Sequence, residues 1–227
     1  MNTRNLIRWT GLAAMAAGII FAGIQPIHPL DVLSSVTTDA WAISESLKVA
    51  MCILGLIGLT GLYARQANEA GWLGLAGYLL FSLFYVLTAP YTFAEAVILP
   101  LLATTAPTFV EGFLGLFNRH PIEMNLGALA ALYKLSGIVY IFGGLLFGFA
   151  TFRAGILPRW AAGLLAVGAA LSPVAELLPL EYKALVAVPV GLALAWLGYA
   201  LWSERREHAA EPVPGRGSSQ LRPTAAE

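Results

Sequence analysis

Residues 126–152 read LGALAALYKLSGIVYIFGGLLFGFATF, and Lys134 is the only charged residue in this segment. A helix needs about 20 mostly apolar residues to cross a hydrocarbon core roughly 30 Å thick. The segment is longer than this minimum. It therefore predicts a membrane-spanning helix.

Similar apolar segments recur on both sides of it. The chain has 227 residues, of which 58% are hydrophobic and only 11% are charged, and its mean hydropathy is +0.73. In soluble domains, about a quarter of all residues are charged. We therefore predict an all-α fold, a polytopic integral membrane helix bundle with six transmembrane helices. The predicted spans are residues 6–24, 42–63, 71 to at least 89, 126–152, 159–178 and 182–202.

The two ends of the chain need separate interpretation. Arg4 and Arg8 precede the first apolar run, as in a signal peptide, but residues 22–28 contain no clear small-x-small cleavage site, which favours a retained helix. Residues 204–227 are charged and then rich in Pro, Gly and Ser. Such a segment has too few apolar residues to fold. The sequence predicts a transmembrane domain over residues 1–203 and a disordered cytoplasmic tail over residues 204–227.

Basic residues predict the orientation. Lys and Arg accumulate in the cytoplasmic loops of membrane proteins. One side would carry Arg4, Arg8, Arg65, Arg153, Arg159, Arg205, Arg206, Arg216 and Arg222, and the other only Lys48, Arg119, Lys134 and Lys183. We therefore expect both termini in the cytoplasm, and a multi-pass protein of a bacterial inner membrane.

The composition also narrows the classes of function. Thirteen basic residues balance thirteen acidic ones, so no net charge attracts nucleic acid. The sequence has one cysteine, Cys52, and contains neither a zinc-ligand spacing nor a glycine-rich nucleotide fingerprint. We therefore predict no metal and no cofactor, and membrane lipids as the immediate partners.

Away from the cytoplasmic ends of the predicted spans, ionisable residues lie only near the outer interface. With a rise of roughly 1.5 Å per residue, Lys48 lies roughly 25 Å from the cytoplasmic boundary at Arg65. The same calculation places Glu95, Lys134 and Glu176 near the outer interface as well. We therefore expect no charged residue at the bilayer centre, where most ion-coupled transporters carry their charged residues. The predicted polar ring consists of Glu45, Lys48, Glu95, Lys134 and Glu176, with His28 as a further candidate. Ordinary interfacial charges are the alternative interpretation.

The third span carries a polar and aromatic stripe at helical spacing: Tyr78, Ser82, Tyr85, Thr88, Thr92 and Glu95. Such a stripe faces other helices or a cavity rather than lipid. The predicted binding residues are therefore Lys134, Glu95, Glu45, Lys48, Glu176, Tyr85, Thr88 and Thr92. Interhelical hydrogen bonding explains the stripe equally well. Residues 107–118 show apolar residues at helical spacing, which favours an interfacial helix or a loop packed over the bundle.

These patterns support three hypotheses of function. The first is a binding or accessory protein, or a transport-related one, that holds a lipid-like or amphiphilic small molecule in an outward-facing polar pocket. The second is a small intramembrane enzyme acting on a lipid or isoprenoid, with Glu95 and Glu176 as acid and base; no catalytic residue is assigned. The third is a structural subunit whose glycine faces pack against another membrane protein.

Two segments carry a resemblance to known proteins. They are SLKVAMCILGLIGLTGLYARQ at residues 46–66 and FRAGILPRWAAGLLAVG at residues 152–168. Both resemble uncharacterised bacterial multi-pass membrane protein families of similar length. Because these families have no agreed activity, the resemblance implies a helical membrane fold and no site residue.

Overall fold

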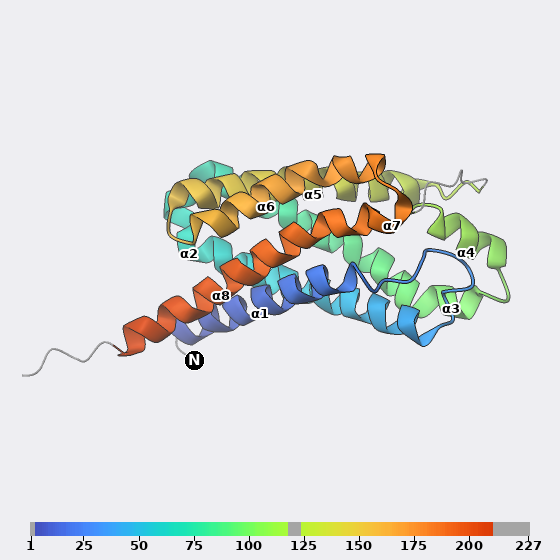
Figure 1. Cartoon of the computed structure of the whole chain (residues 1–227), viewed down its shortest axis with the longest axis horizontal. Coiled ribbons are helices and arrows are strands. Elements are labelled where there is room, and N and C mark those ends of the chain that lie inside the picture. The colour runs from blue at the N-terminus through green and yellow to red at the C-terminus, as the bar shows by residue number, and fades with distance from the viewer. Residues whose placement is uncertain (1–2, 118–123, 211–227) are drawn as a thin grey trace, which may run out of the picture.

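The helices form one elongated bundle. The computed structural model describes residues 3–117 and 124–210, among which there is no β-strand (Figure 1). Its elements are α1 (Thr3–Ile24), α2 (Asp39–Phe93), the π-helix η1 (Ala94–Ile98), α3 (Leu99–Leu102), α4 (Pro107–Leu114), α5 (Ala128–Ala154), α6 (Arg159–Leu171), the 3₁₀-helix η2 (Ser172–Leu177), α7 (Leu180–Lys183), the 3₁₀-helix η3 (Ala184–Ala187) and α8 (Val188–Ala210). The all-α prediction is confirmed.

Four helical segments are long and apolar enough to cross a membrane among the described residues. They are Leu6–Ile24, Asp39–Leu102, Ala128–Ala154 and Ala184–Ser203, and a shorter apolar segment covers Arg159–Ala175. The second contains 64 residues, which is long enough for two crossings at about 20 residues each. The apolar helices agree with a membrane protein.

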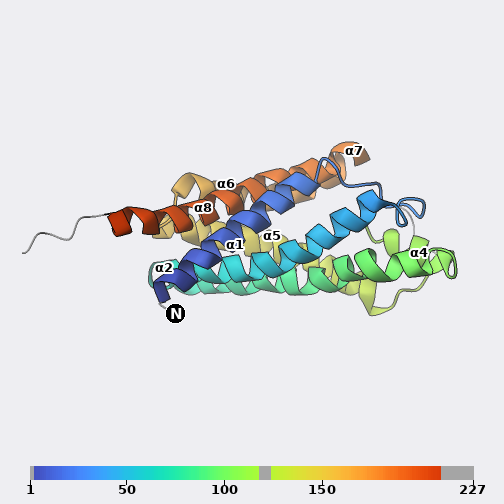
Figure 2. The ribbon, with the colours of Figure 1, turned by 90° about the horizontal axis from the view of Figure 1, so that it is seen from below.

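The longest segment folds back on itself. Gln66 (φ −130°, ψ 16°) and Gly71 (φ 59°, ψ −157°) have non-helical backbone angles within α2. Figure 2 shows the two halves of α2 running in opposite directions from this turn. Gly71 adopts a backbone conformation that residues with a Cβ rarely reach. By contrast, the helix continues through Pro90, where the sequence favours a kink, and changes to a π-helix one turn later.

Small residues bring the helices together. α1 packs on α8 and α2, while α5 packs on α2 and α6. A Cβ atom at Gly18 would collide with the backbone of Ala195, and one at Gly58 with Ala14. On α5, the same holds for Gly148 against Ala166, as expected from small residues spaced four apart. These glycines are therefore used for packing within the chain.

The bundle has two different ends. We call the end formed by residues 25–38, α3, α4 and α7 the capped end, and the end with the Gln66–Gly71 turn the kinked end; they lie at the right and left of Figure 1. The predicted helix in residues 107–118 is present as α4, and its Val110, Phe113 and Leu114 are buried against Trp41, Tyr91 and Leu99. Asn118 lies outside the described residues.

At the C-terminus, α8 extends further than predicted. It continues to Ala210, so the first residues of the predicted tail are helical, and residues 211–227 lie outside the described residues.

Candidate functional site: a buried charged cluster at the capped end

Three segments bring charged side chains together at the capped end. We call His28, Glu45, Lys48 and Glu95 the charged cluster. His28 comes from the loop after α1, Glu45 and Lys48 from the second and third turns of α2, and Glu95 from η1. Thr38 caps the N-terminus of α2: its hydroxyl accepts a hydrogen bond of 3.3 Å from Trp41 N. This cap fixes where the helix begins.

Glu45 is the centre of the cluster. Its Oε1 lies 2.7 Å from His28 Nε2 and 2.8 Å from Lys48 Nζ, and its side chain is 0% exposed. Lys48 Nζ also lies 3.6 Å from Glu95 Oε2, whose side chain is 2% exposed. One ammonium group thus links two buried carboxyl groups. Removing one partner from such a buried arrangement leaves an uncompensated charge.

The π-helix determines where Glu95 points. A π-helix inserts one extra residue per turn, and such turns are frequent at functional sites. The indole Nε1 of Trp41 donates a hydrogen bond of 2.9 Å to the backbone oxygen of Glu95. Trp41 also lies against the His28 ring, with a centroid distance of 5.8 Å. This tryptophan therefore joins the start of α2 to η1 and to the preceding loop.

The hydrogen bonds of His28 require a proton between His28 and Glu45. His28 Nδ1 lies 2.6 Å from the backbone oxygen of Pro29, an acceptor, so Nδ1 must donate. Nε2 faces Glu45 Oε1 at 2.7 Å. If Nδ1 carries the proton of a neutral imidazole, Glu45 must be protonated and donate; otherwise His28 is an imidazolium that donates at both nitrogens. In either state, one proton lies in this contact.

Asp31 extends the cluster on the loop side. Burial raises the pKa of this carboxyl group, and the positive charges of His28 and Lys48 oppose this rise without cancelling it. Lys183 is also close enough to act on Asp31 electrostatically. Its Nζ donates a 3.4 Å hydrogen bond to the backbone oxygen of Phe117.

An apolar layer adjoins the cluster. Trp41 belongs to a buried group that also contains Val36, Tyr91, Leu99, Val110, Phe113 and Leu114. Four rings of this layer form a connected set of contacts, and we call Tyr91, Phe113, Phe117 and Tyr133 the aromatic cap. Tyr91 anchors the cap through a hydrogen bond from its hydroxyl to Leu129 O at 2.5 Å. Trp41 is the residue that joins this layer to the cluster, because it contacts both His28 and the backbone of Glu95.

The predicted polar stripe continues from the cluster into the bundle. Cys52, one turn after Lys48, and Thr92, one turn before Glu95, are both buried. Thr92 also donates to Ala89 O at 3.1 Å. Tyr85 is buried next to Gly55 and Phe81. Thr88 Oγ1 is buried without a hydrogen-bond partner among the described residues. The stripe therefore faces the protein interior, as predicted.

The structure divides the predicted polar ring. Glu45, Lys48 and Glu95 come together, whereas Lys134 is exposed and takes no part in the ion pairs found among the described residues. The inward face of α5 carries Ser136, Val139 and Tyr140 instead. The cluster is thus smaller than the sequence analysis indicates and does not include Lys134. The side chain of Glu176 lies outside the described residues.

The loop after α1 contributes more to the site than its sequence indicates. His28 was only a further candidate, and neither Asp31 nor Trp41 was among the predicted binding residues. A histidine close to acidic residues in a link between two spans was the available signal. Its partner, Glu45, is 17 residues away and follows no local pattern.

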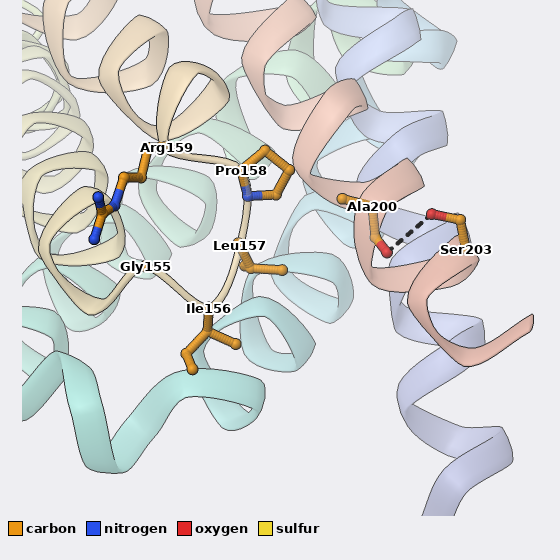
Figure 3. Close-up of a pocket in the computed structure, with 7 residues that line it drawn as sticks. All are labelled: Gly155, Ile156, Leu157, Pro158, Arg159, Ala200 and Ser203. Atoms are coloured by element: carbon orange, nitrogen blue, oxygen red, sulfur yellow. Dashed lines mark hydrogen bonds between the residues drawn. The ribbon is translucent and has the colours of Figure 1, made fainter. Parts of the chain in front are cut away.

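The surface depressions lie elsewhere. One of ≈ 480 Å³ lies between the α5–α6 connection and α8 at the kinked end, lined by Leu157, Pro158, Ala200 and Ser203 among others (Figure 3). Ser203 Oγ donates to Ala200 O at 3.2 Å across one side of it. The other, of ≈ 230 Å³, adjoins Tyr63 and Trp72. The charged cluster itself is largely closed to water, because Glu45 and Glu95 expose 0% and 2% of their side chains and Lys48 and His28 only 21% and 15%.

The donor set at the cluster is not that of a metal site. Within residues 3–117 and 124–210, no group of three or more His, Cys, Asp or Glu side chains is placed to hold a metal ion. The ammonium group of Lys48 already lies between the two glutamates, and it would repel a cation there. The groups that remain are suited to exchange protons and to bind charged head groups.

Known proteins give no further information about this site. The chain matches no family model, no curated protein and no solved structure. The resemblance to bacterial multi-pass families therefore stays a prediction.

Proposed function

We propose that the chain is a six-span protein of the bacterial cell membrane with its capped end outside and both termini in the cytoplasm. The apolar helices, the fold-back within α2 and the shorter apolar segment Arg159–Ala175 support six crossings. The Arg residues at the kinked end support the orientation, since basic residues favour the cytoplasmic side. They include Arg65, Arg153 and Arg159.

Within this frame, we propose that the capped end binds the polar head of a lipid-like molecule. The observation that carries the proposal is the charged cluster: four ionisable side chains from three segments, largely buried in a membrane helix bundle at the same end as the aromatic cap. Ionisable groups inside a membrane protein are costly and mark functional sites by default. The aromatic cap supplies apolar surface beside them.

Charge balance favours a zwitterionic head. The buried groups already carry both signs: the carboxyl groups of Asp31, Glu45 and Glu95 lie against the ammonium of Lys48 and the proton held between His28 and Glu45. A zwitterionic head exchanges partners without adding net charge: its ammonium replaces Lys48 beside Glu95, and its phosphate binds Lys48. An anionic head would leave net charge in a buried site, which is expensive. Because the cluster is closed, binding requires displacement of the loop at residues 25–38.

The alternatives have less support. The subunit hypothesis relied on glycine faces, and Gly58 and Gly148 are occupied by neighbouring helices of the same chain. The enzyme hypothesis needs a substrate within reach of Glu95, and this side chain is only 2% exposed.

Native mass spectrometry tests the proposal with two probes, phosphatidylethanolamine and phosphatidylglycerol, added to the delipidated protein. We expect the zwitterionic lipid to be retained preferentially by the wild type and by Lys134→Gln, and its retention to fall at least tenfold in Lys48→Gln. Lys134→Gln is the matched control because it removes an exposed lysine from the same chain. Equal retention in all three proteins, or a preference for phosphatidylglycerol, would contradict the proposal.

A further inference from the structure

The two buried glutamates each have one oxygen without a donor. Glu45 Oε2 and Glu95 Oε1 are buried and have no hydrogen-bond partner among the described residues. Lys48 lies on the other oxygen of each carboxyl group, at 2.8 Å from Glu45 Oε1 and 3.6 Å from Glu95 Oε2. Buried polar atoms without partners are rare in native proteins, and each calls for an explanation.

The two carboxyl groups also lie beside each other, because both contact the same atom, Lys48 Nζ. Two carboxylates cannot hydrogen-bond to each other, because an ionised carboxyl group only accepts. If one of the two carries a proton, its hydroxyl can donate to the other, and both groups gain a partner at once. Two adjacent buried carboxyl groups generally titrate as one unit that holds a proton.

We propose that Glu45 and Glu95 form a proton-binding site that holds one shared proton while the capped end is closed. The site does not depend on the proposed lipid binding, because its components are all groups of the chain itself. Its proton is separate from the one held between His28 Nε2 and Glu45 Oε1.

The surrounding charges agree with this assignment. The charged and titratable groups facing the pair are His28 and Asp31 from the loop, Lys48 and Cys52 from α2, and Lys183 from α7. Asp31, Glu45 and Glu95 against Lys48 give −3 + 1 = −2. The proton between His28 and Glu45 and the proton shared by Glu45 and Glu95 bring the net charge of this group to zero. Lys183 lies at the edge of the group. A neutral cluster is the least costly form in a buried site.

Release of the shared proton would loosen the cap. Two adjacent carboxylates repel, and Glu45 is the residue that holds His28 and with it the loop at residues 25–38. Since the folded protein would bind a proton that the unfolded chain releases at neutral pH, stability falls as the pH rises.

Infrared difference spectroscopy of the full chain in lipid, recorded across a pH step in H₂O and D₂O, tests the proposal. We expect the C=O stretch of a protonated carboxyl group at neutral pH, with a deuterium shift, and its loss in both Glu45→Gln and Glu95→Gln. Glu111→Gln, an exposed glutamate on α4, is the control and should keep the band. A spectrum with no band that depends on Glu45 or Glu95 would overturn the proposal and indicate a bridging water between two carboxylates.

Thermal unfolding of Glu95→Gln provides a second measurement that does not depend on the band. A glutamine amide donates to Glu45 as the shared proton does, so this variant should be as stable as the wild type at neutral pH and lose less stability as the pH rises. If Glu95 is ionised in the resting protein, Glu95→Gln removes a partner of Lys48. A clear loss of stability at neutral pH with an unchanged pH dependence would therefore overturn the proposal.

Discussion

The two ends of the bundle place their polar residues differently. At the capped end, Glu45 and Glu95 are buried and held by Lys48, whereas at the kinked end Arg153 and Arg159 are exposed. The buried polar residue at the kinked end, Gln66, is neutral and donates to Thr151 Oγ1 at 2.7 Å. A buried neutral amide costs less than a buried charge. The buried charges at the capped end therefore cost more free energy than the buried amide at the kinked end. This cost makes the capped end the better candidate for a functional site.

Removal of Lys48 should break the capped end most strongly. Lys48→Ala leaves two buried carboxyl groups without their cation, and we expect a loss of about 3 kcal/mol in the free energy of unfolding. Lys134→Ala, an exposed lysine, should change it by less than about 0.5 kcal/mol. Thermal unfolding in mild detergent measures both. Equal effects would mean that the cluster is ordinary interface chemistry.

The kinked end should respond to backbone change rather than to charge. Gly71→Ala forces a side chain onto φ 59° and ψ −157°, which costs about 1 to 3 kcal/mol. No neighbouring atom lies within 4 Å of the added Cβ, so the loss would come from the backbone alone. Gly137→Ala, a helical glycine with equally open space around it, is the control and should stabilise slightly. Unchanged stability in Gly71→Ala would argue against the sharp turn.

The hydrogen bond from Trp41 to the backbone oxygen of Glu95, which joins the start of α2 to η1, should contribute less to stability than the turn at Gly71. Trp41→Phe keeps an aromatic ring but removes the donor to Glu95 O, and we expect a loss of about 1 kcal/mol. Hydrogen exchange of η1 should accelerate in this variant, while exchange in α6 stays unchanged. Faster exchange at both ends would indicate a general loss of stability instead.

The smallest effect should come from Asp31. Burial raises its pKa, so the folded state holds this proton more tightly than the unfolded chain. The resulting stabilisation is present at acid pH and is lost as the pH rises through the raised pKa of the folded state. Asp31→Asn should therefore match the wild type at acid pH and exceed it at neutral pH, by about 1 kcal/mol or less. A pH series of unfolding temperatures would check this sign.

Part of this arrangement could be predicted from the sequence. Apolar segments and small residues repeat along the chain, and the glycine contacts of α5 with α6 follow from their spacing. The proximity of Glu45, Lys48 and Glu95 could be predicted from depth alone, because all three lie near the outer ends of their predicted spans. The polar stripe on α2 also faces inward as expected.

The rest depended on features without a sequence signal. α5 is apolar on nearly all sides, so no hydrophobic face indicates which way Lys134 points, and depth alone suggested a site residue. The contact of His28 with Glu45 depends on the path of a loop. The π-helix at Glu95 changes the direction of that side chain, and no residue pattern in this region predicts a π-helix; Pro90, just before it, favours only a kink.

A double-mutant cycle of Lys48→Gln and Glu45→Gln tests the central claim most directly, namely that these side chains form one buried, coupled unit at the capped end. We predict that the two substitutions are non-additive in unfolding free energy by about 1 kcal/mol or more. The same cycle with Lys134→Gln in place of Lys48→Gln should be additive within about 0.5 kcal/mol. Additive effects for Lys48 and Glu45, or equal coupling for both lysines, would contradict the account.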